Sequence, residues 1–255
     1  MQDPAGQYIT SFFYPASNPV EPQAAGHSRW SQRWLLAFAV AWTHVWLAAC
    51  VQAAEPARLQ TPALAPATPA ARQLIDWVRA SGDNQRLPFI VIDKRQALAL
   101  AFDAAGQLRG TSPVLLGAAR GDHSVPGIGE RPMASILPQE RTTPAGRFVA
   151  EIGHNAKGED IVWVDYEAAV SLHRVRPHVA AERRLERLAT ASPRDNRITY
   201  GCINVPQAFF EQVVRPLVDA AQGRAVVYVM PEVLPLSAVF PGLGQALKTA
   251  AWRAG

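Results

Sequence analysis

The sequence predicts a mainly β fold, a sandwich or a barrel, with helices at its periphery. Between Leu87 and Met230, short apolar runs follow one another closely and are separated by polar or glycine-rich turns. Helical spacing appears before, within and after this region but does not alternate with each strand, which argues against a doubly wound α/β sheet. Apolar residues make up 49% of the 255-residue chain, so a sizeable core can be buried.

The individual elements follow from local pattern. Leu74, Trp77 and Val78 lie at helical spacing and predict a helix over 71–80, whereas Pro206 suits the first turn of a later helix that Pro216 is expected to break or kink. In chain order we expect a helix at 71–80, a hairpin of 89–92 and 97–102, a strand within 108–116, a loop at 117–129, strands at 148–152 and 161–164, a basic helix within 176–191, a helix at 206–214 and a buried strand at 225–230.

Residues 1–54 are expected to be a disordered N-terminus followed by a signal peptide or membrane anchor. Arg29 and Arg33 flank the start of the uncharged run 34–49, which is shorter than the roughly 20 residues of a spanning helix. We expect cleavage before Ala54 or, because 47–50 resembles a lipoprotein processing box, acylation of Cys50; a buried core helix is the alternative. Residues 55–86 then form an Ala/Pro-rich linker with a short helix, 87–231 the main domain and 232–255 a peripheral C-terminal tail.

Charge and cysteine content limit the classes of function. A net charge of +4 suits an anionic polymer as partner, but no Lys/Arg run is dense enough to predict nucleic-acid binding. Two cysteines exclude a disulfide-rich scaffold and a four-thiolate zinc site. Once the leader is removed or Cys50 is acylated, Cys202 is the one free thiol, either an inert buried residue or a reactive nucleophile.

Chemistry is concentrated in residues 199–204, Thr-Tyr-Gly-Cys-Ile-Asn. Gly201 permits unusual backbone angles beside Cys202, and the helix expected from Pro206 would favour a thiolate. A thiol nucleophile needs a base, and His173 ends an apolar strand-like run as a cleft residue would. Spacing alone does not pair His173 with Cys202, and a core or surface histidine is the alternative.

These residues resemble the L,D-transpeptidase catalytic domain family, whose signature is His followed later by Ser/Thr-His-Gly-Cys-hydrophobic-Asn. Here His173 precedes 199–204, and five of the six positions in the second element match. The turn 143–148, Thr-Pro-Ala-Gly-Arg-Phe, is similar to the family's Thr-Pro-x-Gly-x-Phe turn, and the hairpin 90–108 to its opening strands. The resemblance covers about 87–231 and implies a β-sandwich catalytic domain there.

The resemblance also implies a role for each site residue. Cys202 would be the acylated nucleophile and His173 its proton acceptor and donor, oriented by the backbone carbonyl of Arg174. The amides of Tyr200, Gly201 and Cys202 would form the oxyanion hole. Thr199 and Asn204 would contact substrate, with Asn204 also supporting the site through hydrogen bonds.

Three features depart from the family pattern. Tyr200 replaces the usual histidine, and Arg174 stands where glycine or serine is common. The segment between His173 and Cys202 is longer than usual and contains the basic insert 176–191, which would be a lid over the site or a solvated decoration.

The implied activity is peptidoglycan L,D-transpeptidation in the periplasm, at a peptide stem whose third and fourth residues are joined by an L,D bond. Terminal D-alanine would leave, and the acyl group would pass to a second stem, to an envelope protein or to water. No cofactor or metal is implied, and a membrane only through the N-terminal segment. A different periplasmic cysteine amidase and a wall-binding module are the alternatives.

Overall fold

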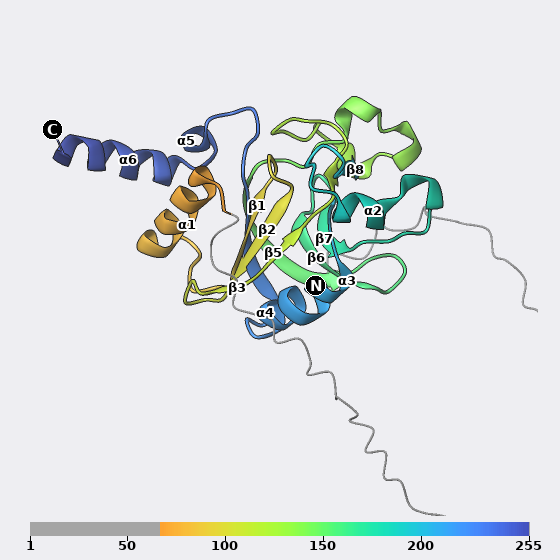
Figure 1. Ribbon diagram of the computed structural model, residues 1–255, viewed down its shortest axis with the longest axis horizontal. Helices are drawn as coiled ribbons and strands as arrows, with labels where there is room; N and C mark the ends of the chain where they lie inside the picture. Colours follow the sequence, from red (N-terminus) through yellow and green to blue (C-terminus); the bar gives the residue numbers. More distant parts are fainter. Residues whose placement is uncertain (1–66, 255) are drawn as a thin grey trace, which may run out of the picture. The chain divides into compact units, whose positions relative to one another are not determined.

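The computed structural model describes residues 67–254 (Figure 1). The expected signal peptide or anchor, the alternatives at Cys50 and most of the linker lie outside these residues. Within 67–254, no helix is long and apolar enough to cross a membrane.

The described chain is built on one mixed eight-stranded sheet, which confirms the mainly β prediction with peripheral helices. Its strand order is β3-β2-β1-β10-β5-β6-β7-β9, and a separate parallel pair joins β4 to β8. Neighbours are antiparallel except for the pairs β1–β10 and β7–β9. The strands are β1 (Phe89–Asp93), β2 (Leu98–Phe102), β3 (Leu108–Pro113), β4 (Leu116–Gly117), β5 (Gly146–His154), β6 (Asp160–Asp165), β7 (Val170–Arg174), β8 (Arg197–Thr199), β9 (Ile203–Val205) and β10 (Arg224–Val229).

The β1–β2 hairpin shows why these runs are apolar without alternation. Every residue of β1 is buried, because both faces of this part of the sheet are covered. The turn is closed by Asp93, whose carboxylate accepts the backbone N–H groups of Arg95 and Gln96. The expected strand 108–116 is interrupted after Pro113 and continues as β4, which leaves the main sheet to pair with β8.

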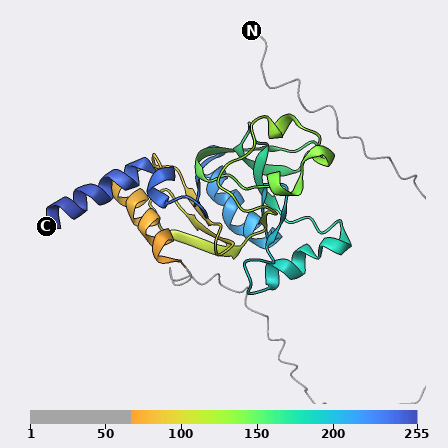
Figure 2. The same ribbon diagram turned by 90° about the horizontal axis from the view of Figure 1, so that it is seen from above.

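Helices cover the two faces of the sheet (Figure 2), and the sheet separates two hydrophobic cores. Helix α1 (Pro69–Ser81), with Thr68 as its N-cap, buries Leu74, Ile75 and Val78 in the core that contains Phe89 and Tyr228. The other core includes Ile90 and Val227, the alternate residues of the same strands, and draws on strands from β2 to β9.

The helix after Pro206 is longer than expected. It runs through α3 (Gln207–Phe209), a π-helical segment, η5 (Phe210–Val214), and α4 (Arg215–Asp219). The helix continues through Pro216 to Asp219, so the expected break does not occur, and the alternative of a kink stays a prediction. Proline follows the π-helical segment at the start of α4, where a missing backbone N–H is tolerated. Phe210, Val213 and Val214 are buried, as their spacing predicted.

The basic insert is less helical than expected. A 3-10 turn at Ala180–Glu182 is followed by α2, which covers only Arg184–Ala189. Arg183 between them has a left-handed backbone with φ 49° and ends the first turn. Figures 1 and 2 both place α2 away from α1 and the C-terminal helix, α6 (Pro241–Ala254), on the side of β6 and β7.

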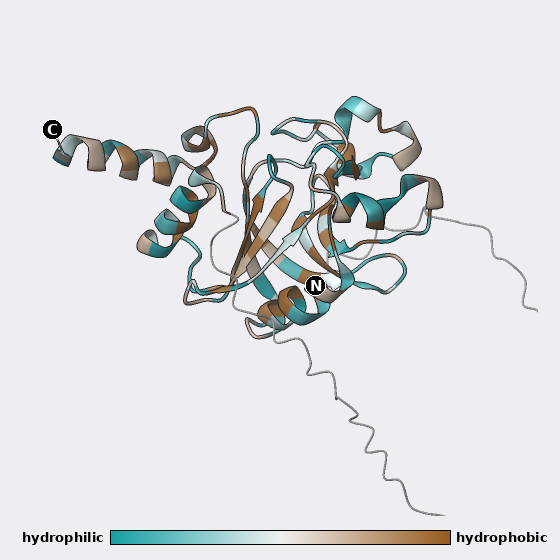
Figure 3. Cartoon of the chain, viewed as in Figure 1, coloured by the Kyte–Doolittle hydropathy of each residue, from teal (hydrophilic) through white to brown (hydrophobic). Residues whose placement is uncertain are grey.

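The segment from Glu232 is more closely packed at its start than a peripheral tail. Helix α5 (Leu236–Val239) precedes α6 (Pro241–Ala254), and Phe240 and Leu243 are buried against α1 and the sheet. Only the later part of α6 extends away from the sheet, where Leu247 and Trp252 are exposed (Figure 3).

Candidate active site

The pairing of β7 with β9 brings the predicted site residues together. These strands are parallel, with Leu172 opposite Ile203 and His173 opposite Asn204. Cys202 immediately precedes β9 and therefore lies beside the residues of β7 that alternate with buried Leu172. Because β9 separates Cys202 from α3, the expected position at a helix N-terminus is wrong.

The imidazole of His173 is held from both sides. Its Nδ1 lies 2.7 Å from the carbonyl oxygen of Arg174, and this contact requires a proton on Nδ1. Its Nε2 lies 3.0 Å from Nδ2 of Asn204. The structure thus brings His173, the Arg174 carbonyl and Asn204 into one hydrogen-bonded group, with the unprotonated Nε2 as acceptor.

The thiol of Cys202 lies against β7. Its Sγ is 3.6 Å from Oγ of Ser171 and 3.7 Å from the carbonyl oxygen of Ala169. Burial by itself raises the pKa of this thiol. The hydrogen bond and charge interaction with His173 and the hydrogen bonds from Ser171 outweigh that effect and lower the pKa to about 7. The pKa of the Cys202 thiol therefore lies closer to neutral pH than that of an ordinary cysteine.

Sequence reasoning missed Ser171. The signal was available, because Ser171 lies two residues before His173 and such positions of a strand share one face.

Gly201 is required by close backbone packing. Its φ is +136°, and a Cβ added there would lie 2.8 Å from the carbonyl oxygen of Thr142. Thr143, which follows Thr142 and begins the turn 143–148, also contacts this glycine. Its Oγ1 donates to the Gly201 carbonyl at 2.8 Å. The turn therefore lies directly beside the cysteine loop.

Thr199 stabilises this loop from within. Its hydroxyl accepts the N–H of Gly201 at 3.1 Å and donates to the carbonyl of Cys202 at 2.7 Å. The side chain is buried, so the structure places Thr199 inside the loop and not at a surface open to substrate. The N–H of Gly201 is thereby engaged, which corrects its expected place in an oxyanion hole.

The two neighbouring amides differ from that of Gly201. The N–H groups of Tyr200 and Cys202 donate to no acceptor within residues 67–254. The side chain of Tyr200 makes a separate contact, because its ring stacks against the guanidinium of Arg141, whose Cζ lies 3.9 Å from the ring centre.

A polar hollow of about 460 Å³ adjoins His173. Its lining comes from the β5–β6 turn, the end of β7, the start of the insert and α3: Gly158, Glu159, Asp160, His173, Arg174, Val175, Arg176, Pro177, His178 and Gln207. A second hollow of about 470 Å³, between α1 and the segment after β10, contains none of the predicted site residues. Within 67–254, no group of three or more His, Cys, Asp or Glu side chains is arranged to hold a metal ion.

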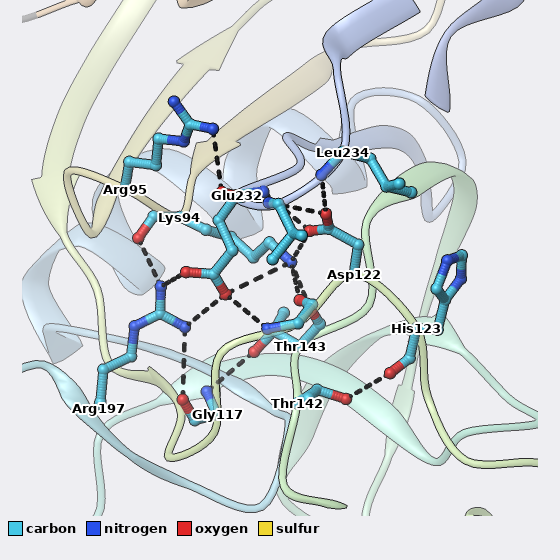
Figure 4. Close-up of polar contacts among 12 residues, drawn as sticks. Lys94, Arg95, Gly117, Asp122, His123, Thr142, Thr143, Arg197, Glu232 and Leu234 are labelled. Atoms are coloured by element: carbon cyan, nitrogen blue, oxygen red, sulfur yellow. Dashed lines mark hydrogen bonds and ion pairs between the residues drawn. The ribbon is translucent and has the colours of Figure 1, made fainter. Parts of the chain in front are cut away.

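A buried charged cluster lies behind the turn 143–148 (Figure 4). Lys94 Nζ donates to Asp122 at 2.9 Å and to the carbonyl oxygens of Gly121 and Thr143 at 2.5 and 2.8 Å. Glu232 lies 3.8 Å from the same ammonium and pairs with Arg197 at 2.6 Å. Thr143 connects this cluster to Gly201, so the cluster supports the cysteine loop from the far side.

Comparisons with known proteins give only distant structural likeness. No protein-family model and no curated protein sequence matches the chain. The catalytic domain of an L,D-transpeptidase from E. faecium is similar at TM-score 0.31 and 16% identity, covering 56% of this chain and 96% of that domain. A mutant of Pgp2, the helical cell shape determining protein of Campylobacter jejuni, is similar at TM-score 0.38 and 11% identity, covering 73% of this chain and 66% of that protein.

Proposed function

We propose that this protein is a cysteine-dependent L,D-transpeptidase acting on peptidoglycan stem peptides. One observation carries the proposal: a thiol with its pKa lowered to about 7 lies beside an imidazole whose Nδ1 is fixed by a backbone carbonyl. This arrangement provides a nucleophile, a base and an orienting group without a carboxylate. The family resemblance of 199–204 and 143–148 supplies the substrate class.

The reaction would proceed through a thioester. Cys202 Sγ attacks the carbonyl of the L,D peptide bond while its proton passes to Nε2 of His173. The amide N–H groups of Tyr200 and Cys202 stabilise the developing oxyanion. His173 then protonates the departing amine, and D-alanine leaves as the C–N bond breaks.

The second half of the reaction restores the enzyme. An acceptor amine attacks the thioester, His173 takes the amine's proton, and the new amide forms as the C–S bond breaks and the thiol is restored. A stem-peptide amine would give a cross-link, a protein lysine an anchored protein, and water a shortened stem. We propose that the enzyme works in the periplasm, where the N-terminal segment would deliver it.

The hydrolytic and transfer outcomes are separated by one experiment. The purified full-length protein is incubated with tetrapeptide muropeptides, and products are identified by mass spectrometry. We expect D-alanine release together with new dimers, and a mass adduct on the peptide that contains Cys202.

The two cysteines provide matched controls. Cys202→Ala should abolish D-alanine release while preserving the fold, whereas Cys50→Ala should leave turnover unchanged. Release without dimers would indicate a carboxypeptidase. If neither product nor adduct appears with the wild-type protein, the proposed chemistry is wrong, and binding of the protein to isolated cell wall becomes the test of a non-catalytic role.

A further inference from the structure

The basic insert contacts the site through the side chain of Arg184. Its Nη1 donates to Oδ1 of Asn204 at 2.7 Å, and its Nε donates to Glu182 at 2.5 Å. The contact with Asn204 is shielded, since the Arg184 side chain is 15% exposed and Asn204 is 1% exposed. Asn204 in turn contacts Nε2 of His173, so a continuous hydrogen-bonded chain joins the insert to the imidazole.

This chain fixes which way the amide of Asn204 faces. A guanidinium offers only donors, so the atom of Asn204 that faces Arg184 must be the oxygen. The NH₂ group must then face His173, where it donates to Nε2. The amide cannot exchange its two ends while Arg184 holds the oxygen, because an N–H would then oppose the guanidinium.

A locked donor at Nε2 has a chemical consequence. When the thiol gives its proton to His173, Nε2 becomes an N–H and faces the N–H of Asn204, which is unfavourable. If the amide could turn, its oxygen would accept that proton and stabilise the imidazolium. The orientation set by Arg184 therefore opposes ionisation of the Cys202–His173 pair.

We propose that Arg184 is a positioning residue that, by holding the Asn204 amide as a donor to Nε2, raises the pH at which Cys202 becomes a thiolate. The proposal rests on the proposed function of His173 as the base. It assigns the insert to control of the nucleophile, and not to a solvated decoration of the surface.

Three ion pairs lie around His173. Arg174 contacts Glu211, Arg176 contacts Glu159, and Asp160 contacts Arg215. The groups that face His173 from the neighbouring elements are Glu159 and Asp160 of the β5–β6 turn, Arg174 of β7, Arg176 and His178 of the segment that follows, and Cys202 of the loop before β9. None of these three ion pairs includes Arg184.

The test is the pH dependence of Cys202 alkylation in the full-length protein. Iodoacetamide is applied between pH 5 and 9, and modification is followed by the mass of the peptide that contains Cys202. In Arg184→Met the midpoint of alkylation should fall by about one pH unit, which corresponds to about tenfold more alkylation at a pH below the midpoint. A shift of this size is expected when one hydrogen bond to His173 is exchanged for another. Loss of a cation alone would move the midpoint upward, because a cation favours the thiolate.

Two variants serve as controls. Arg184→Lys keeps a head group that only donates, and its midpoint should stay near that of wild type. Arg183→Met removes the adjacent arginine, which is 69% exposed and pairs with Glu186, and should have no effect. An unchanged or raised midpoint in a folded Arg184→Met protein would overturn the proposal.

A second measurement needs no variant. In ¹⁵N-labelled wild-type protein, the hydrogen bond predicts a scalar coupling between Nδ2 of Asn204 and Nε2 of His173. Its absence at a pH where His173 is neutral would also overturn the proposal. Neither measurement uses peptidoglycan, so a shifted midpoint without D-alanine release would refute the transpeptidase alone, and release with an unchanged midpoint would refute the lock alone.

Discussion

Replacement of Lys94 by methionine tests the buried charged cluster most directly. The ammonium is fully buried and donates to Asp122 and to the carbonyl oxygens of Gly121 and Thr143. Methionine preserves most of the side-chain volume but leaves two carbonyl oxygens and one carboxylate without this donor. Removal of one member of a buried ion pair costs about 3–5 kcal/mol of unfolding free energy.

The structure places the expected loss at the lower end of that range. Asp122 keeps three backbone donors, the N–H groups of Glu232, Val233 and Leu234, and Glu232 keeps its pair with Arg197. We therefore expect a loss of about 3 kcal/mol, which lowers Tm by about 6–12 °C for a domain of this size.

Urea unfolding followed by circular dichroism measures this loss, with Lys157→Met as the control. Lys157 is exposed, so its replacement should change the unfolding free energy by less than about 0.5 kcal/mol. A loss below about 1 kcal/mol in Lys94→Met, or a gain, would refute the reasoning, because it would mean that the remaining groups satisfy one another without the ammonium.

Three further predictions concern the charged cluster and the residues around Cys202 and His173. Burial raises the pKa of Asp122, but backbone donors and Lys94 lower it to about 2. The stabilising contribution of this carboxylate is therefore lost as pH falls from about 4 to 2, so the unfolding free energy of Asp122→Asn should decrease less steeply than that of the wild type over this pH range. Gly201→Ala should cost about 1–3 kcal/mol in urea and slow Cys202 alkylation, because its Cβ meets the Thr142 carbonyl. Arg174→Ala keeps the backbone carbonyl that holds Nδ1 of His173, so Cys202 should still be alkylated, while stability falls by about 1 kcal/mol because the stacking on Phe210 is lost.

Local patterns predicted much of the strand layout because burial here follows short-range sequence. The apolar run 89–92 became β1, and the helical spacing of Leu74 and Val78 became the buried side of α1. The same reasoning left open whether Pro216 breaks or kinks its helix, and the structure excludes the break because α4 continues beyond Pro216 after the π-helical segment. It also overestimated the helix of the insert, where Arg183 adopts a left-handed backbone.

The charged cluster could not be predicted from periodicity. Lys94 lies in the polar turn of the first hairpin, where an exposed lysine is the usual outcome. Its burial depends on Asp122, Glu232 and Arg197, which come from distant parts of the chain. The segment from Glu232 was expected to be peripheral for the same reason. Phe240 and Leu243 are buried by contacts with α1 and the sheet, which are distant in the chain.

The sequence by itself determined the mainly β architecture and identified Cys202, its glycine neighbour and His173 as the candidate catalytic residues. Only the tertiary structure decided that β7 and β9 are neighbours, which places Ser171 and His173 beside the thiol and Asn204 beside the imidazole. It also decided that Arg184 reaches the site and that the Gly201 amide is engaged by Thr199. The physical reason is that periodicity reports which face of an element is buried, whereas strand neighbours and hydrogen-bond partners depend on contacts between residues far apart in the chain.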